Sequence, residues 1–275
     1  MEGFSSKRVA SRQGRELKIN LRDFSGAQAR RAVYTGAMRL GAHAHDWPSL
    51  VLHVLGGYRE RNESGEMTIA RPAAVLHPRQ IGHEEIFEDG GAEFVILQFD
   101  PHWLGLRGKA ADLGAARCWT YGVTAGLVRT LARAWSNPAL SEQDLRRITA
   151  AFLETAMRHS ETKCPRWLSH VELALSQANP PTTTALARKL DMHEAWLARA
   201  YRVATGEGLQ ETLRRRKAER AIKLLRSSGS PLAEIAFTAG FCDQSHMNRV
   251  VLEFTGRTPC EIRHEAQRSA HNELH

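Results

Sequence analysis

Three histidines in the N-terminal half have the residue type and spacing to bind a metal ion. His43 and His45 are two positions apart, so both imidazoles would point to the same face of an extended strand. His83 follows later in the chain. Imidazole nitrogens bind Zn, Fe and Ni, so this group predicts a metal site, the polar wall of a small-molecule site, or surface histidines. His53 and His77 are further candidates, for which backbone hydrogen bonds are the simpler explanation.

A second polar group lies near the C-terminus. Residues 231–241 carry apolar side chains at helical i, i+3, i+4 and i+7 spacing, namely Leu232, Ile235, Ala236 and Ala239. Gly240 stands where a helix end needs a left-handed residue, and Asp243 or Ser245 can cap the helix that follows. That helix begins with polar side chains, which is the pattern of a helix that enters the DNA major groove.

Residues 168–265 resemble the DNA-binding domain of the AraC/XylS transcriptional regulators. Matches in the second helix-turn-helix unit are Ile235, Ala236, Gly240, Phe241, Asp243, Gln244, Ser245, Arg249, Phe254, Gly256, Thr258, Pro259 and Arg263. Matches in a first unit are Leu186, Ala187, Met192, Leu197, Arg199, Tyr201, Arg202, Gly206 and Leu213. The sequence departs from the family pattern at Met247 and Val251, where phenylalanine is usual, and at Leu252, where lysine is usual.

The resemblance implies two reading helices, joined by a helix over about residues 210–227, that enter successive major grooves about 34 Å apart. The expected contacts of the first helix are His193, Glu194, Trp196, Arg199 and Arg202; those of the second are Asp243, Gln244, Ser245, Asn248 and Arg249.

Some of these assignments have alternatives. Arg249 could instead be a structural ion-pair partner, and Trp196 could belong to the core. The seven basic residues between 214 and 226 could form a solvated helix face, with only a subset touching phosphates. Phe237, Phe241 and Phe254 are expected in the core.

Residues 16–100 have short apolar runs between turn residues, which predicts a β-barrel or sandwich. Residues 50–55 should form one strand that ends at Gly56 and Gly57, and residues 93–99 should form another. The histidine spacing resembles a cupin barrel, which AraC-type regulators often carry as a sensor. The glutamate usual after the cupin histidine pair is missing, since Asp46, Trp47 and Pro48 follow instead.

The expected fold class is therefore α+β, with a cupin-like barrel over residues 16–121 and an all-α DNA-binding domain over residues 168–265. Residues 122–162 have helical periodicity and could pack on the barrel or mediate a homodimer through Leu145, Ile148, Phe152 and Leu153. The remaining segments are a basic tail at residues 1–15, a linker at 163–167 and a C-terminal tail at 266–275.

Composition adds weaker constraints. The net charge is +8, with 16 Lys/Arg against 12 Asp/Glu in residues 166–275 and 22 against 18 elsewhere, so charge alone only weakly indicates a polyanion partner. The four cysteines have neither zinc-site nor disulfide-framework spacing, which fits a reducing cytoplasm. No apolar stretch is long enough for a membrane span, and we expect no membrane association.

These observations predict a regulator, more often an activator in this family, that binds double-stranded DNA and responds to a small-molecule effector. A homodimer and a contact with RNA polymerase are further expectations. No enzyme activity and no resident cofactor are expected. The alternatives are a metal-dependent cupin enzyme fused to a DNA-binding module, which would use His43, His45 and His83, and a nucleic-acid-binding protein without an effector.

Overall fold

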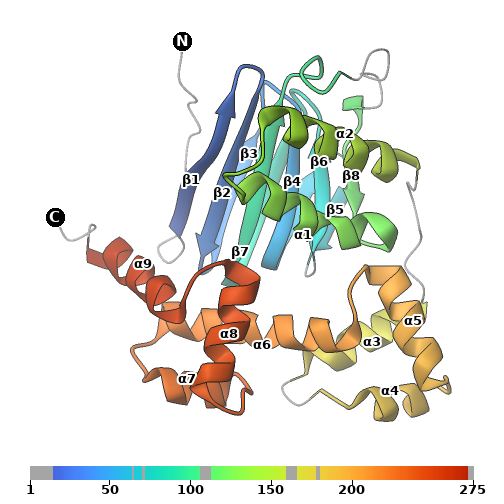
Figure 1. Ribbon diagram of the computed structural model, residues 1–275, viewed down its shortest axis with the longest axis vertical. Helices are drawn as coiled ribbons and strands as arrows, with labels where there is room; N and C mark the ends of the chain where they lie inside the picture. The colour runs from blue at the N-terminus through green and yellow to red at the C-terminus, as the bar shows by residue number, and fades with distance from the viewer. Residues whose placement is uncertain are drawn as a thin grey trace. The chain divides into compact units, whose positions relative to one another are not determined.

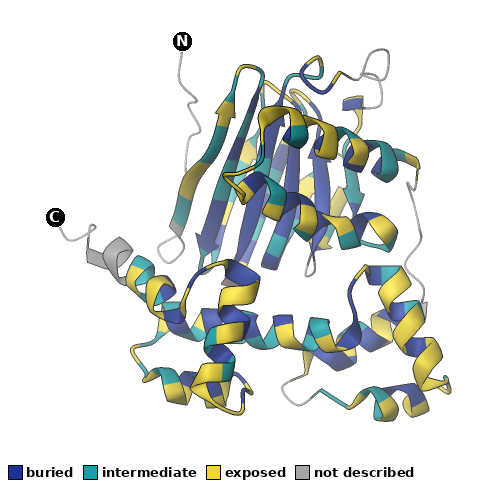
Figure 2. Cartoon of the chain, viewed as in Figure 1, coloured by how far each residue is buried: buried dark blue, intermediate teal, exposed yellow. Residues whose placement is uncertain are grey.

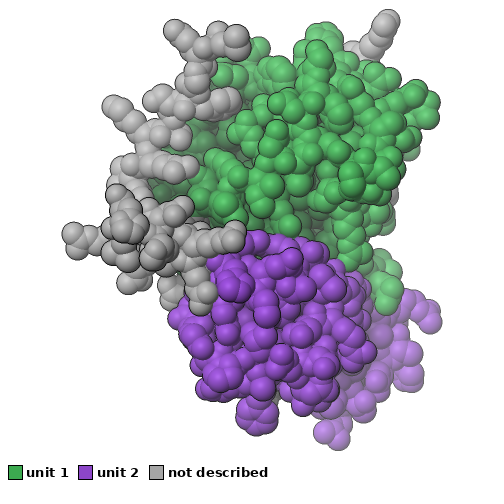
Figure 3. Space-filling view, turned by 60° about the vertical axis from the view of Figure 1, so that its left-hand side comes forward, with its two compact units in different colours: residues 1–168, 200–206 green, residues 169–199, 207–275 purple. Residues whose placement is uncertain are grey.

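The computed structural model of the protein describes residues 15–63, 65–69, 72–105, 113–158, 166–177 and 180–271. Two compact units are present: residues 1–168 with 200–206, and residues 169–199 with 207–275 (Figure 3). Residues 200–206 were expected in the DNA-binding domain but are grouped with unit 1. Residues 1–14 of the expected N-terminal tail, most of the expected linker and the last four residues of the C-terminal tail lie outside the described residues, and Arg15 already belongs to the first strand.

Unit 1 is built on an antiparallel sheet (Figure 1). Its strands are β1 (Arg15–Phe24), β2 (Ala27–Thr35), β3 (Met38–His43), β4 (Ser49–Asn62), β5 (Gly65–Ile69), β6 (Ala73–His77), β7 (His83–Phe99) and β8 (Arg117–Trp119). The order is β1-β2-β7-β4-β6-β8, with β3 on β7 and β5 on β4. The first half of the chain thus forms the expected antiparallel β domain, with no βαβ crossover among its described strands.

Two long strands let this sheet fold over on itself. The prediction that a strand ends at Gly56 was wrong, because β4 continues to Asn62 and shifts register around that glycine. Gly56 has φ +84°, and a Cβ there would lie 2.2 Å from the Gly91 carbonyl oxygen of β7. The close approach and the left-handed φ both require glycine. Beyond the bend, Tyr58 of β4 and Phe87 of β7 pack against Tyr34 and Phe94 of the other half.

Helices α1 (Gly122–Ser136) and α2 (Glu142–Arg158) cover one face of the sheet (Figure 1). The buried residues that join them to the sheet include Leu50, Leu52, Leu76, Leu97, Val128, Leu131, Trp135, Leu145, Phe152 and Leu153. A reciprocal capping box starts α2, since the Asp144 amide donates to Ser141 Oγ and the Ser141 amide donates to the Asp144 carboxylate. The apolar stripe expected on α2 is therefore used within unit 1, except that Ile148 is exposed.

Unit 2 is helical. Its elements are α3 (Arg166–Ser176), α4 (Thr183–Lys189), α5 (Glu194–Thr205), α6 (Leu209–Ser227), α7 (Leu232–Thr238), α8 (Gln244–Thr255) and α9 (Pro259–His271), of which parts of α3 and α5 are grouped with unit 1. Helix α9 runs to His271, inside the segment expected as a tail.

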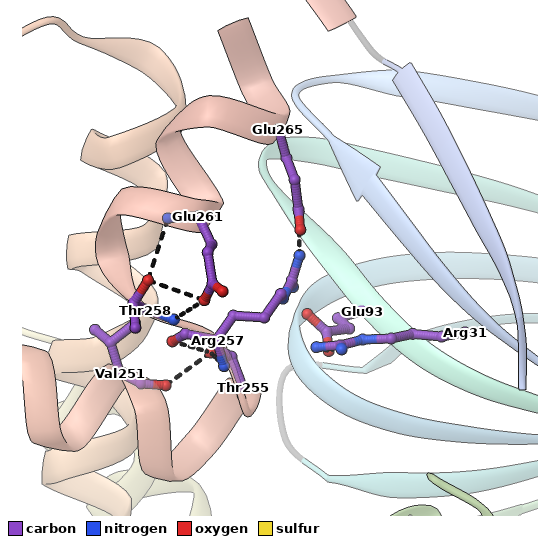
Figure 4. A network of polar contacts seen from close by, with 8 residues as sticks. All are labelled: Arg31, Glu93, Val251, Thr255, Arg257, Thr258, Glu261 and Glu265. Carbon is purple, nitrogen blue, oxygen red and sulfur yellow. Dashed lines mark hydrogen bonds and ion pairs between the residues drawn. The ribbon is translucent and has the colours of Figure 1, made fainter. Parts of the chain in front are cut away.

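Polar contacts secure the start of α9 and, separately, join two neighbouring strands of the sheet (Figure 4). Thr258 and Glu261 form a capping box at the start of α9, and Arg257 pairs with Glu265 along it. Within unit 1, Arg31 of β2 donates from Nε to Glu93 of β7 at 2.8 Å. Figure 2 shows the resulting burial, with dark blue along the sheet and on the inner faces of the helices. No helix in the described ranges is long and apolar enough to cross a bilayer.

Candidate functional site

Helices α7 and α8 form the helix-turn-helix predicted near the C-terminus. Ile235, Ala236 and Ala239 are buried as expected, while Gly240 takes φ +89° directly after α7. The Phe241 amide donates to the Ala236 carbonyl at 2.9 Å, which closes the end of α7. The short turn is thus held by backbone hydrogen bonds that only a left-handed residue at position 240 allows.

Asp243 begins α8 as its N-cap. Its Oδ1 accepts a hydrogen bond from the His246 amide at 2.6 Å, and this bond is the main reason why the pKa of the Asp243 carboxyl lies below its usual value. A second contribution comes from the Cys242 thiol. Asp243 therefore has a structural task at this position, whatever else it contacts.

The exposed face of α8 carries the polar residues that the sequence singled out. Gln244, Ser245 and Arg249 are exposed, and Asn248 is half-buried. The opposite face buries Met247, Val250, Val251 and Phe254. Met247 and Val251 thus replace the family's phenylalanines in the core, as expected, and Leu252 is exposed where the family places a lysine.

The first helix-turn-helix has the same construction. Thr182 caps α4 by accepting from the Ala185 amide, and Asp191 adopts φ +53° in the turn. Helix α5 then buries Leu197 and Tyr201. The predicted contact residues on α5 and just before it are all exposed, namely His193, Glu194, Trp196, Arg199 and Arg202. Trp196 is 50% exposed, so it is not a core residue.

Two of these residues also have local partners. Glu194 accepts from Thr184 Oγ1 at 2.8 Å. His193 Nδ1 accepts from the Ala195 amide at 3.3 Å at the start of α5. Glu194 therefore ties the two helices of this unit together, and a contact with DNA would compete with that bond.

Most of the basic run on α6 is bonded within unit 2. Arg215 pairs with Glu207 at 3.2 Å and with Glu219 at 2.7 Å, and Arg216 pairs with Glu172 at 2.6 Å. Arg214 pairs with Glu253, and Arg220 donates to the Ala239 carbonyl at 3.3 Å. Lys223 is exposed. The run thus mainly holds the helices together, which narrows the set of residues that can meet phosphates.

One core prediction in this unit was wrong. Phe237 is 83% exposed on α7, whereas Phe241 and Phe254 are buried as expected. Helix α7 buries the side containing Ile235, Ala236 and Ala239, and Phe237 follows Ala236 on the side that faces away. The helical periodicity places Phe237 off the apolar face of α7. The wrong prediction came from its residue type, because phenylalanine is usually buried.

The structure brings His43, His45 and His83 together in unit 1. One ligating atom from each lies within 4.8 Å of the others. The expected geometry was wrong in one respect, because β3 ends at His43 and His45 lies beyond it. A register shift precedes His43, and the backbone amide of Gln80 donates to the His45 carbonyl at 2.8 Å. Loop contacts, rather than strand alternation, therefore bring His45 to the group.

Burial keeps these imidazoles neutral. It lowers the pKa of His45 to about 4 and that of His83 to about 2, with further lowering from the neighbouring histidines. It also lowers the pKa of His43. A metal ion binds the neutral form of imidazole, so His43, His45 and His83 are in the form that can hold a metal ion. No carboxylate joins the group among the described residues.

Sequence reasoning named His77 as a further candidate but missed two buried acids, Glu60 and Glu85, beside these histidines. His77 stacks on His83 with ring centroids 3.8 Å apart, and its Nε2 lies 3.0 Å from Glu60 Oε1. Glu85 is also buried, and burial raises its pKa to about 7. Glu60 was hidden because it stands between two arginines, Arg59 and Arg61, and reads as part of a solvated charge run. Only strict alternation along a strand that faces the interior could have located it.

Comparisons with known proteins identify the family through the C-terminal part of the chain. The family model for a helix-turn-helix domain matches residues 186–265. The regulatory protein SoxS of Salmonella typhimurium is 31% identical over 85 residues, which cover 31% of this chain and 79% of SoxS. The chain belongs to the AraC/XylS family of transcriptional regulators.

Another curated relative is the transcriptional regulator VirS of Mycobacterium tuberculosis, which is 26% identical over 123 residues. That match covers 45% of this chain, and the chain spans only 36% of the length of VirS. These curated relatives are regulators and not enzymes.

Solved structures also resemble the chain. ToxT of Vibrio cholerae has 11% identity and a TM-score of 0.37, with 86% of this chain and 97% of ToxT covered. A cupin superfamily protein of Desulfitobacterium hafniense has 11% identity and a TM-score of 0.30, with 33% of this chain and 83% of that protein covered.

Proposed function

We propose that this protein is a sequence-specific regulator of transcription that binds double-stranded DNA through α5 and α8 and responds to a small molecule bound in unit 1. One observation carries the proposal. Both helix-turn-helix units bury an apolar face and expose the polar residues that the family uses for reading DNA. Such helices present hydrogen-bonding side chains to base edges in the major groove.

The residues then have distinct roles. Arg199, Arg202 and Arg249 suit guanine, because a guanidinium can donate two bonds to its O6 and N7. Gln244 and Asn248 suit adenine for the same geometric reason. The remaining proposed contacts are His193, Glu194, Trp196, Asp243 and Ser245. Asp243 and Glu194 would act mainly by holding the reading helices in place, since both already have partners.

The experiment is a salt-dependent binding assay on DNA from upstream of its own and neighbouring genes, beside a random duplex. We expect a footprint across two adjacent major grooves. Arg249→Ala should weaken specific binding by about 1–3 kcal/mol and relax the base preference at one position. Arg133→Ala, which changes an exposed arginine on α1, is the matched control and should leave the footprint intact. Equal affinity for all duplexes at physiological salt would sink the proposal.

The remaining parts of the proposal rest on the family. An activator that works in the cytoplasm, contacts RNA polymerase and forms a homodimer is the usual arrangement. The apolar stripe of α2 is largely used inside unit 1, so a second copy would have to dock on the exposed residues Val123, Leu127 and Ile148. Ile148→Glu should then halve the mass measured by light scattering, and an unchanged mass would remove this surface as the dimer contact.

A second candidate function is metal binding by unit 1. It rests on the convergence of His43, His45 and His83, whose ligating atoms lie within 4.8 Å of one another. Metal binding at these three histidines would make the state of unit 1 depend on the concentration of free metal ion. Titration of the chelated protein with Zn²⁺ or Ni²⁺ should show one equivalent bound, lost in His45→Ala and retained in His102→Ala, which changes an exposed histidine. Equal binding by both variants would exclude the site.

A further inference from the structure

The first reading helix, α5, exposes a surface that is mostly apolar. Beyond Glu194, four residues in its first two turns are exposed, three of them alanine or tryptophan: Ala195, Trp196, Ala198 and Arg199. Glu194 is exposed as well, but its carboxylate already accepts from Thr184 Oγ1 at 2.8 Å. Arg199, with five N–H donors, therefore supplies most of the hydrogen-bonding capacity of this surface.

The second reading helix, α8, exposes a different kind of surface. The side chains in its first two turns that are exposed or half-buried all carry hydrogen-bonding groups, namely Gln244, Ser245, His246, Asn248 and Arg249. The large apolar residue in these turns, Met247, is buried. Helix α8 can therefore read base edges through hydrogen bonds, whereas α5 has to depend more on apolar contact.

Trp196 provides most of the apolar surface at the start of α5. It is 50% exposed, although tryptophan is highly buried on average. Leu197 and Tyr201 on the other side of the helix are buried and hold the backbone that carries the ring. The side chains of Ala195 and Ala198 are small, so they allow the helix to come close to a ligand. Tryptophan has only two side-chain torsions, so little conformational entropy is lost when its ring makes a contact.

The chemistry of the major groove indicates what such a surface can recognise. The C5-methyl group of thymine is the apolar group that base edges present there, while the other features are hydrogen-bond donors and acceptors. An apolar side chain gains free energy by burying the methyl group. It loses free energy when it covers a donor or acceptor without forming a hydrogen bond. The residues near the N-terminus of a reading helix are those that reach the base edges, and Trp196 lies at that end of α5.

We infer that Trp196 selects thymine in the major groove that α5 enters, through contact of its ring with the C5-methyl group. The inference rests on the proposed function and names the bases that one of the two reading helices recognises. The two halves of the DNA site are then read by different chemistry. Apolar contact with thymine methyl groups dominates under α5, and hydrogen bonds dominate under α8.

The test uses the full-length protein and the DNA site defined by its footprint, with thymine replaced by deoxyuridine in one major groove at a time. Deoxyuridine forms the same base pair and lacks only the methyl group. Loss of one contacted methyl group should weaken binding about fourfold, the ratio that corresponds to about 0.8 kcal/mol for a buried group of this size. The groove that α5 enters should show this response, and the other groove should not.

Three variants assign the response to the ring. In Trp196→Ala, the replacement of thymine by deoxyuridine should leave the affinity unchanged. Trp196→Phe keeps an aromatic ring without the indole N–H and should keep the response. Phe237→Ala is the matched control, because it removes a ring that is 83% exposed from α7, which is not a reading helix, and it should respond as the wild type does. Protein and DNA changes together form a double-mutant cycle, which isolates the contact between ring and methyl group.

Several outcomes would overturn the inference. One is equal affinity for the thymine and deoxyuridine sites in both grooves. Another is the same deoxyuridine response in Trp196→Ala as in the wild type, which would place the ring on the sugar-phosphate backbone. Loss of the response in Trp196→Phe would assign the contact to the indole N–H instead. A footprint without dependence on thymine methyl groups would defeat only this inference, whereas equal binding to all duplexes would defeat the proposed function itself.

Discussion

Arg215 and Glu207 form a buried ion pair inside unit 2, with Arg215 Nε 3.2 Å from Glu207 Oε1. Arg215 is only 1% exposed, and its Nη1 also meets Glu219 at 2.7 Å. Glu207 in turn accepts from Thr212 Oγ1 at 2.9 Å. These bonds hold the segment between α5 and α6 against helix α6. They therefore fix the direction in which the chain passes from the first reading helix, α5, into the connecting helix, α6.

Removing one partner of this buried pair should lower the free energy of unfolding far more than removing one partner of an exposed ion pair. Arg215→Ala leaves Glu207 buried and uncompensated, so the free energy of unfolding should fall by about 3–5 kcal/mol. Arg214→Ala, one residue earlier, removes a partner of Glu253 that is half in water and should cost at most about 1 kcal/mol. Urea unfolding followed by circular dichroism measures both. Similar losses in the two variants would show that the pair is not the anchor.

Substitutions at Asp243 can distinguish its role as a helix cap from a role in reading a base. Asp243→Ala removes the acceptor of the His246 amide and should lower stability by about 1 kcal/mol, with weaker binding to every DNA sequence. Asp243→Ser keeps a capping oxygen and should restore stability. If Asp243→Ser also restores affinity, the role is capping alone; if it changes the preferred base, Asp243 touches that base as well. Thermal melts and binding to a set of substituted operators give the two readouts.

Truncation to alanine should affect stability very differently at two phenylalanines that are four residues apart. Phe241→Ala removes a buried ring and should cost about 3–5 kcal/mol. Phe237→Ala changes a ring that is 83% exposed, so unfolding should shift by less than about 0.5 kcal/mol. Denaturant titration of the two variants checks this. A large loss in Phe237→Ala would mean that the ring is covered in solution.

The contrast between Phe237 and Phe241 indicates what the sequence can predict. The helix-turn-helix units were predictable because their signals are local: apolar spacing, Gly240 after α7, and the Asp243 cap all lie within a few residues of one another. The bend of the long strands was not, because Gly56 and Gly57 look the same as a strand end. Whether they end a strand or bend it depends on β7, which is distant in sequence.

The polar interior of unit 1 shows the same limit. The spacing placed His43 and His45 on one strand face, and the cupin resemblance added His83, yet His45 lies beyond the strand and is held by a loop contact with Gln80. Glu85 gave no signal of its own, since Glu84 beside it is an acid of the same type that pairs with Arg39. Only the cross-strand pairing of Glu85 with Glu60 reveals that one of the two adjacent glutamates faces inward.

Acid should destabilise unit 1 through its histidines when no metal is bound. The folded-state pKa of His45 is lowered to about 4 and that of His83 to about 2, mainly by burial, while both would titrate near 6.5 in the unfolded chain. Below about pH 6.5 the unfolded chain therefore binds more protons than the folded one, so the free energy of unfolding falls as pH falls. Above that pH these residues contribute no slope.

The measurement is Tm between pH 8 and pH 5 in the presence of a chelator. His45→Gln removes one of the depressed groups, so its Tm should fall less steeply than that of the wild type below pH 6.5. His102→Gln changes an exposed histidine and should follow the wild-type curve. Glu85 acts in the opposite direction, because its raised pKa stabilises the fold at low pH and that contribution is lost as pH rises towards 7. Parallel curves for His45→Gln and wild type would show that His45 is not held in its neutral form by the fold.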